Sequence, residues 1–375
     1  MTTIPPLDLT QQYATIEAEV GTAVLDVLAS GRYINGPQVE EFVQAFKAYV
    51  GSPECVACNS GTDALYLALR ALEIGPGDEV ITSPFTFIAT AETISAVGAT
   101  PVFVDIDPNT FNLDLDQIET AITERTKALM PVHLFGCPVD MTRLMAVAVA
   151  HRLPVIEDCA QATGATWQGQ RVGSMGDFGC FSFFPSKNLG GCGDGGALTV
   201  RLPELAEAAR IVREHGSRVK YYHESVGINS RLDTVQAAIL QIKLRYLDRW
   251  NQGRTTVAER YHQLLAPIDE VICPSAPAGS THVWNQYTLR LHQATGEERD
   301  RVRAALQAQG ILTMVYYPLP LHHQPVYAEL GYGPGSFPQA EQASQQVLSL
   351  PMFPELTPEQ QERVVYGLKA AILAG

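Results

Sequence analysis

The stretch FSFFPSKNLGGCGDGGAL, residues 181–198, places one lysine between an aromatic run and a glycine-rich run. Lys187 follows Phe-Phe-Pro, so we expect partly apolar surroundings. Burial lowers the pKa of a lysine because it disfavours the charged ammonium, and a neutral amine attacks a carbonyl to form a Schiff base. The stretch therefore predicts a nucleophilic amine, although a surface lysine beside a flexible hairpin has the same local pattern.

The turn NSGTDAL, residues 59–65, opens a helix. The first N–H groups of a helix have no internal partner, and the helix dipole makes that end positive. Gly61 lets a ligand approach the backbone, and Ser60 and Thr62 add hydroxyls. This combination is typical of a phosphate site and also of an ordinary N-cap. It matches neither a P-loop nor the spaced glycines of dinucleotide-binding proteins.

The stretch VIEDCAQATGA, residues 155–165, ends an apolar strand with Glu157 and Asp158. In open α/β sheets, ligands bind at the carboxyl ends of the strands. A carboxylate there either keeps a ligand's ring nitrogen protonated or caps the next helix. The lysine, the helix start and Asp158 together fit pyridoxal phosphate, whose aldehyde, phosphate and pyridine nitrogen need these three groups.

Strands and amphipathic helices alternate around these candidate residues. In GTDALYLALRAL, residues 61–72, Leu65, Leu69 and Leu72 occupy one helical stripe. This alternation predicts a mostly parallel sheet covered on both faces. The expected strands are DEVITS, PVFVDID, KALMPVHL and PVIEDC, and the helices between them are TFIATAETISAVG, LDQIETAI and DMTRLMAVAVAHR.

The pattern changes after Gly173. Two β-segments, DFGCFSFF and GALTV, flank the glycine-rich run, and a long helical region follows over roughly residues 232–265. The strand-like NQYTLRL and a helix near residues 301–309 then predict a small α+β domain. We predict a large domain over residues 1–250 and a small domain over residues 251–375.

The composition is that of an ordinary globular enzyme, with 375 residues, 46% hydrophobic and 18% charged. The net charge of −14 argues against nucleic acid or an anionic membrane as partner. No apolar run approaches the about 18 residues of a membrane span, and MTTIPPLDLTQQY lacks a signal-peptide pattern. The seven cysteines indicate no disulfide framework, and CVAC lacks the second pair of a zinc site. We expect a cytoplasmic protein without a bound metal.

Over nearly its whole length the chain resembles the DegT/DnrJ/EryC1/StrS family of pyridoxal-phosphate-dependent nucleotide-sugar aminotransferases. The resemblance implies an aspartate aminotransferase-like fold (fold type I), in which the large domain carries a mostly parallel seven-stranded sheet and the small C-terminal domain is α+β. The segments that carry it, in order, are SGRYINGPQVEEF, NSGTDAL, TFIATAETI, PVFVDIDPNTFNLD, VIEDCAQATGA, FSFFPSKNLGGCGDGGAL, GINSRLDTVQAAIL and YYPLPLHHQ.

The resemblance assigns cofactor roles to single residues. Lys187 would form the Schiff base and shuttle a proton, and Asp158 would pair with the ring nitrogen. Asn229 would reach the phosphate in the other subunit, which implies a homodimer with shared active sites. The remaining implied contacts are Gln161 near the ring hydroxyl, Phe87 stacked on the ring, and Gly61, Thr62 and Ser182 on the phosphate.

The resemblance also implies L-glutamate as amino donor and a nucleotide sugar as acceptor, with pyridoxamine phosphate as the intermediate form of the cofactor. Arg231 would meet the donor's carboxylate, or it forms an interface salt bridge. The segment KYYHESVGINSRLDTVQAAILQIKLRYLD is most similar to enzymes that aminate a dTDP- or UDP-linked 3-keto sugar. Aromatic and basic side chains suit such a ligand, and the candidates are Tyr33, Phe184, Lys220, Tyr221, His223, Tyr317 and His322.

Four other functions remain open. A 4-keto sugar aminotransferase would share all the cofactor motifs. Pyridoxamine-dependent sugar dehydratases of this family have His in place of the lysine, so Lys187 argues against them. A non-catalytic cofactor-binding regulator is a further alternative. A nicotinamide-dependent oxidoreductase would need a G-x-G-x-x-G motif after the first strand, and GTDAL does not supply one.

Overall fold

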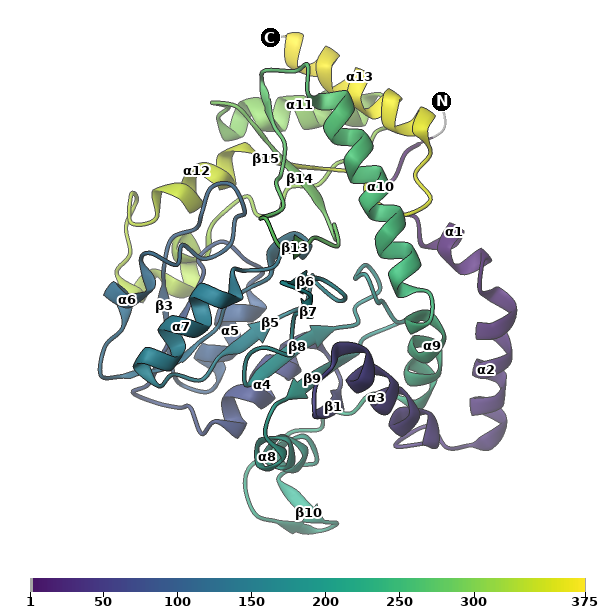
Figure 1. Ribbon diagram of the computed structural model, residues 1–375, viewed down its shortest axis with the longest axis vertical. Coiled ribbons are helices and arrows are strands. Elements are labelled where there is room, and N and C mark those ends of the chain that lie inside the picture. Colours follow the sequence, from purple (N-terminus) through teal and green to yellow (C-terminus); the bar gives the residue numbers. More distant parts are fainter. Residues whose placement is uncertain (1–2, 375) are drawn as a thin grey trace.

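The computed structural model describes residues 3–374, and its main body is a seven-stranded sheet (Figure 1). Its two halves, in the orders β3-β2-β4 and β5-β8-β9-β1, are joined by parallel bridges from Leu129 to Val155 and from Val132 to Asp158. Within this sheet β9 runs opposite to the other six strands. The predicted sheet is confirmed, and its strands are β1 (Glu54–Cys58), β2 (Glu79–Thr82), β3 (Thr100–Phe103), β4 (Thr126–Leu129), β5 (Ile156–Asp158), β8 (Phe178–Ser182) and β9 (Gly196–Val200).

Helices cover both faces of this sheet. Successive strand side chains point to opposite faces, so Val56 and Cys58 belong to one buried cluster and Cys55 and Ala57 to another. The first face carries α4 (Gly61–Ala71), α5 (Ala89–Ala96) and α8 (Pro203–Arg213), and the second carries α3 (Pro37–Val50), α7 (Met141–His151) and α9 (Thr234–Leu244).

Three predicted elements differ in length or number from the structure. The helical region expected over 232–265 is two helices, α9 and α10 (Leu247–Leu265), because the chain bends at Tyr246, whose ring stacks on Trp250. The strand expected at PVFVDID ends at Phe103, since the carboxylate of Asp105 accepts backbone hydrogen bonds from the start of α12 (Pro338–Gln346). LDQIETAI forms only the one-turn helix α6 (Ile118–Ala121).

A second core lies in the upper part of Figure 1 and has the predicted α+β character. Its sheet has the order β12-β14-β15, from β12 (Val271–Ile272), β14 (Tyr287–Leu291) and β15 (Val347–Leu350), packed with α10, α11 (Gly296–Ala308) and α13 (Pro358–Leu373). The domain boundary near residue 250 stays a prediction. It falls inside α10, which contributes Leu247 to the large core and Tyr261 to the small one.

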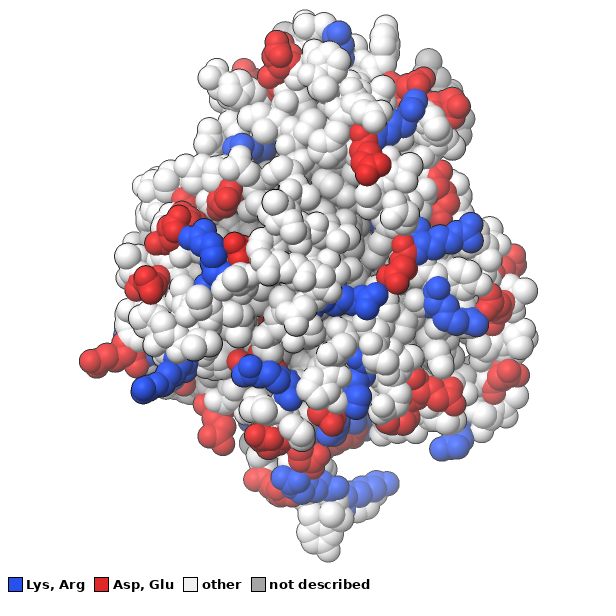
Figure 2. All heavy atoms as spheres, in the orientation of Figure 1, with Lys and Arg blue, Asp and Glu red and all other residues white. Residues whose placement is uncertain are grey.

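A short antiparallel hairpin, β10 (Ser217–Val219) with β11 (Tyr222–His223), projects from the lower end of the molecule (Figure 1). On the face drawn in Figure 2, basic and acidic side chains are interspersed. Within residues 3–374 no helix has the length and apolarity of a membrane span. The remaining elements are α1 (Leu9–Ala14), α2 (Glu17–Ser30), β6 (Thr166–Trp167), β7 (Gln170–Arg171), β13 (Ser280–Thr281) and the 3-10 helices η1 (Leu134–Gly136), η2 (Leu321–His323) and η3 (Pro325–Leu330).

Candidate active site

A cavity of about 370 Å³, here called the cofactor cavity, lies beside the carboxyl ends of β5 and β8 and the first turn of α4. The sheet brings these elements together because β5 and β8 are parallel neighbours, so their carboxyl ends share one edge. The predicted residues that line it are Gly61, Thr62, Phe87, Asp158, Gln161, Ser182, Phe184, Lys187 and Tyr317.

Lys187 carries an amine that forms no hydrogen bond with the part of the chain that the structure describes. Burial lowers the pKa of Lys187 to about 8, and the charge of Asp158 opposes that shift. The next residue, Asn188, donates its side-chain amide to Asn251 Oδ1 at 2.7 Å and to the carbonyl oxygen of Val283 at 2.9 Å. The backbone that carries the amine is thus held by a buried network, while the amine itself is left free to react.

Asp158 is a buried carboxylate at the end of β5. It accepts a hydrogen bond from the Thr90 hydroxyl at 2.8 Å and one from the Ala160 N–H at 3.1 Å. Burial raises the pKa of Asp158, and the two hydrogen bonds together with Lys187 act in the opposite direction. A cationic ring nitrogen in the cavity would supply this carboxylate with a further charge partner beside Lys187.

The first turn of α4 meets the end of β8 without space for another atom. A Cβ built on Gly61 would lie 2.7 Å from the Cβ of Ser182, so only glycine fits there. Ser60 caps the helix, because its hydroxyl accepts the N–H of Asp63 at 3.0 Å. The earlier N–H groups of the turn, with the hydroxyls of Thr62 and Ser182 at the cavity wall, remain available for an anion.

Gln161 and Tyr317 form an oriented pair on the cavity wall. The side-chain oxygen of Gln161 accepts the Phe135 N–H at 2.6 Å, which turns its amide nitrogen toward the Tyr317 hydroxyl at 2.9 Å. The Tyr317 hydroxyl therefore accepts from Gln161 and keeps its own proton for donation. Phe87, more than half exposed, faces Tyr317 with the ring centroids 6.5 Å apart.

The sequence from residue 14 to 369 matches the DegT/DnrJ/EryC1/StrS aminotransferase family. The chain belongs to this family. It is 49% identical over 371 residues to a UDP-N-acetyl-3-dehydro-alpha-D-glucosamine 3-aminotransferase of Acidithiobacillus ferrooxidans, covering 99% of this chain and 98% of that protein. It is 50% identical over 364 residues to a protein of Geobacillus stearothermophilus described as a pleiotropic regulatory protein, covering 96% of each.

Among solved structures, S. venezuelae DesV in complex with a ketimine intermediate superposes with a TM-score of 0.95 at 46% identity, and the match covers 99% of both chains. The family is pyridoxal-phosphate dependent, so this chain is a pyridoxal-phosphate-dependent aminotransferase with fold type I. The cavity fits that cofactor: a free amine, a buried carboxylate and a glycine-lined helix start stand around one space.

Glu157, the other acidic residue at the end of β5, has a different environment in this aminotransferase. Its side chain is fully buried and accepts N–H groups from Gly173 at 2.8 Å, Met175 at 3.0 Å and Gly176 at 2.6 Å. His133 Nδ1 accepts the Val139 N–H, so His133 Nε2 is the donor to Glu157 at 3.0 Å. Glu157 holds the turn before β8 and takes no part in the cavity lining.

Several predicted residues do not line the cofactor cavity within one chain. Tyr221, on the projecting hairpin, is 79% exposed, and Arg231 pairs with Glu214 at 3.4 Å. The His322 side chain is enclosed, and its Nε2 lies 3.1 Å from Glu341. The roles of these residues stay predictions, and the set is Tyr33, Lys220, Tyr221, His223, Asn229, Arg231 and His322.

Sequence reasoning missed other residues of the cofactor cavity. Thr90 lies in the quoted TFIATAETI, yet no local signal links its hydroxyl to Asp158, which is 68 positions away. Gln286 was assigned only to a strand, although the strand begins one residue later at Tyr287. The missed polar residues that line the cavity are Thr86, Ser186, Asp194, Gln286 and Tyr316.

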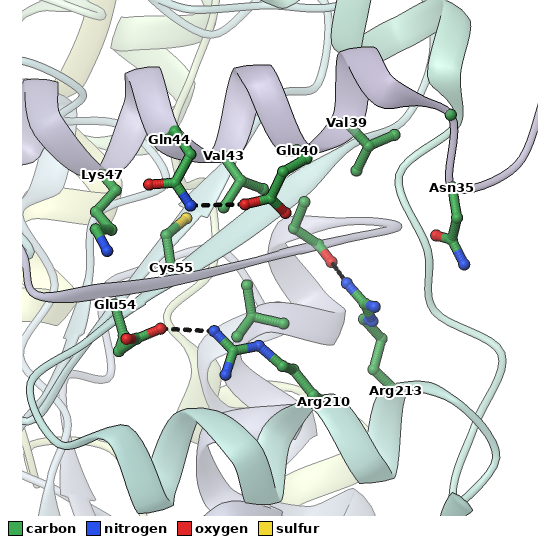
Figure 3. A pocket seen from close by; sticks show the side chains of 13 residues that line it. Asn35, Val39, Glu40, Val43, Gln44, Lys47, Glu54, Cys55, Arg210 and Arg213 are labelled. Carbon is green, nitrogen blue, oxygen red and sulfur yellow. Dashed lines mark hydrogen bonds and ion pairs between the residues drawn. The ribbon is translucent and has the colours of Figure 1, made fainter. Parts of the chain in front are cut away.

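A second cavity, of about 270 Å³, lies along the outer edge of β1 between α3 and α8 (Figure 3). In this β1-edge cavity, Arg210 pairs with Glu54 at 2.6 Å and Arg213 donates to the Ala57 carbonyl at 2.9 Å. Most of its charged side chains already bind protein partners, so few of them are available to bind a ligand.

Proposed function

We propose that this aminotransferase moves the amino group of L-glutamate to the keto group of a nucleotide-linked sugar. The acceptor is a hexose with the keto group at position 3, carried by dTDP or UDP. The observation that carries the proposal is the unbonded amine of Lys187 in one cavity with Asp158 and the start of α4. The names of similar enzymes support the choice of a 3-keto sugar. The products would be amino sugars for polysaccharide, lipopolysaccharide, glycan or antibiotic synthesis in the cytoplasm.

In this proposal each side chain of the cofactor cavity has a separate role. Pyridoxal phosphate, when bound, supplies an aldehyde that joins amines and a ring that takes up electron density. Lys187 would hold it covalently and, once the donor amine replaces Lys187, would carry a proton at Nζ as general acid and base. Asp158 would keep the ring nitrogen protonated. Gly61, Thr62 and Ser182 would bind the phosphate, Phe87 would stack on the ring, and Gln161 would lie at its hydroxyl.

We also propose a homodimer in which each active site takes residues from both chains. The support is exposed apolar surface on segments that carry predicted ligand residues: Tyr33 is 50% exposed and Tyr222, next to Tyr221, is 73% exposed. Single exposed apolar side chains are common on monomers, but several on one short segment are typical of an interface, and here they are Val219, Tyr221, Tyr222 and Val226. Lys220, Tyr221, His223 and Tyr33 would contact the nucleotide sugar across that interface, beside Phe184, Tyr317 and His322 of the proposed site.

The test is an assay of dTDP- and UDP-linked 3-keto and 4-keto sugars with glutamate, with the aminated carbon assigned by NMR. Amination at position 3 supports the proposal. Amination at position 4 would establish the 4-keto alternative. No amination of any sugar, with cofactor bound, would favour a regulator, the function in the name of the Geobacillus relative.

A further inference from the structure

A smaller cavity of about 180 Å³, here called the side chamber, adjoins the cofactor cavity. Ser186, Gln286 and Tyr316 line both spaces, so they form the wall that the two spaces share. The chamber is larger than a site for a single water, which needs only about 10–15 Å³ of cavity volume. Its other walls are mostly apolar and consist of Pro6, Leu7, Asn285, Met314, Ser349, Leu350 and Met352.

Gln286 lies in this shared wall, and its side-chain amide has no protein partner among the described residues. Its Oε1 is buried and unpaired, and its side chain makes no hydrogen bond with any residue that the structure describes. Leaving such a group unpaired costs about 1–3 kcal/mol, and buried polar groups are normally satisfied. The amide oxygen and nitrogen exchange places by rotation of the last side-chain bond, so Gln286 is equally able to present N–H donors to the cofactor cavity.

The backbone that carries Gln286 is fixed. The buried guanidinium of Arg254 donates to the carbonyl oxygens of Trp284 at 3.2 Å and Met352 at 3.0 Å. Asn188, next to Lys187, donates to the carbonyl of Val283. The segment with Gln286 is therefore tied to the same buried network as the reactive lysine, and the amide keeps a constant position relative to that amine.

The charged residues around the two spaces indicate which group of the amino donor needs a further binding partner. Among the residues that line the cofactor cavity and the side chamber, Lys187 is the only cation. An amino acid donor brings its amine to Lys187 and carries a carboxylate on the same carbon. That carboxylate needs N–H or O–H donors close to the lysine, and within one chain Arg231 is paired with Glu214 and lines neither space.

We infer that Gln286 binds the α-carboxylate of the amino donor. The inference rests on the proposed function, since it assigns a place to that reaction's first substrate. The acceptor sugar would lie on the open side of the cofactor cavity, beside Phe87 and Phe184, which are both more than half exposed. Gln286 would then act on one of the two half-reactions only.

The test compares Gln286→Leu and Gln286→Glu with the wild-type holoenzyme in each half-reaction. The donor half is followed by the change in cofactor absorbance with glutamate, and the acceptor half starts from the pyridoxamine form and the keto sugar. Gln286→Leu should raise the half-saturating glutamate concentration at least about tenfold, because it removes one hydrogen bond to a charged group. Gln286→Glu should raise it further, because it sets a carboxylate against a carboxylate. The acceptor half should change less than about threefold.

The matched control is Gln44→Leu, which removes an amide in the β1-edge cavity that donates to Glu40 at 2.7 Å. It should leave both half-reactions unchanged. Equal losses in both halves, or a change for Arg231→Leu with none for Gln286→Leu, would overturn the inference. A wild-type enzyme that reacts with glutamate but aminates no sugar refutes the proposed acceptor alone, because the donor half still reads the role of Gln286.

Discussion

The cofactor cavity and the β1-edge cavity are both framed by the sheet and its helices, with volumes of about 370 and 270 Å³. They differ in how their polar groups are satisfied. In the β1-edge cavity, Arg210 donates to Glu54, Arg213 to the Ala57 carbonyl and Gln44 to Glu40 (Figure 3). In the cofactor cavity the amine of Lys187 and the amide of Gln286 have no such partner.

The Nε of Arg213 in the β1-edge cavity is buried and unpaired as well, so unpaired groups by themselves do not mark the reactive space. Both cavities contain lysine and carboxylate side chains. In the cofactor cavity the free groups stand together with the buried carboxylate of Asp158, and burial lowers the pKa of Lys187 to about 8. The same substitution should therefore lower activity in the cofactor cavity and leave activity unchanged in the β1-edge cavity.

Replacing each cavity's lysine gives the largest expected contrast. Lys187→Ala should lower the transamination rate by at least about a thousandfold, because it removes the group that transfers the proton, while cofactor is still bound. Steady-state rates and the absorbance of bound cofactor measure the two effects. Lys47→Ala, in the β1-edge cavity, is the control and should keep full activity. Comparable losses in both variants would remove the distinction between the cavities.

Replacing a carboxylate in each cavity should give the next largest contrast. Asp158→Asn should lower kcat about a hundredfold, because a neutral amide does not stabilise a protonated ring nitrogen. Glu54→Gln breaks the half-exposed pair with Arg210, so it should leave kcat unchanged and cost at most about 1 kcal/mol of stability. Single-turnover rates and chemical denaturation measure these outcomes. Full activity of Asp158→Asn would contradict the proposed pairing.

The pKa of Lys187 predicts how cofactor uptake depends on pH. Only the neutral amine attacks an aldehyde, and burial lowers the pKa from 10.5 to about 8. Uptake of pyridoxal phosphate by the apo-enzyme should thus rise about tenfold per pH unit below pH 8 and level off above it. Stopped-flow absorbance from pH 6 to 10 measures this profile. A rate that still climbs steeply at pH 10 would indicate an ordinary exposed lysine.

The smallest expected effect concerns the part of the site that one chain does not complete. Asn229→Ala should raise the dissociation constant of the cofactor about tenfold, because it removes one hydrogen bond to a charged phosphate. Equilibrium dialysis of the cofactor measures it. Activity that is unchanged when dilution separates the subunits would refute the shared site, whatever the effect of the substitution.

Much of the fold and the chemical centre of the site followed from the sequence. Helix α4, the strand ending in Asp158 and the glycine-flanked Lys187 depend on contiguous residues, whose apolar spacing, capping and turn chemistry act over a few positions. The family resemblance rests on the same short segments. These features were predictable because their physical causes are local.

Only the tertiary structure decided which distant residues share a wall. Thr90 meets Asp158 and Tyr317 meets Gln161 across 68 and 156 positions, and no local pattern records such pairs. Glu157 and Asp158 are neighbours in sequence, yet strand alternation sends one to the turn before β8 and the other to the cavity. Likewise, that Gln286 is left unpaired beside Lys187 is a property of the packed chain, since burial and missing partners exist only after folding.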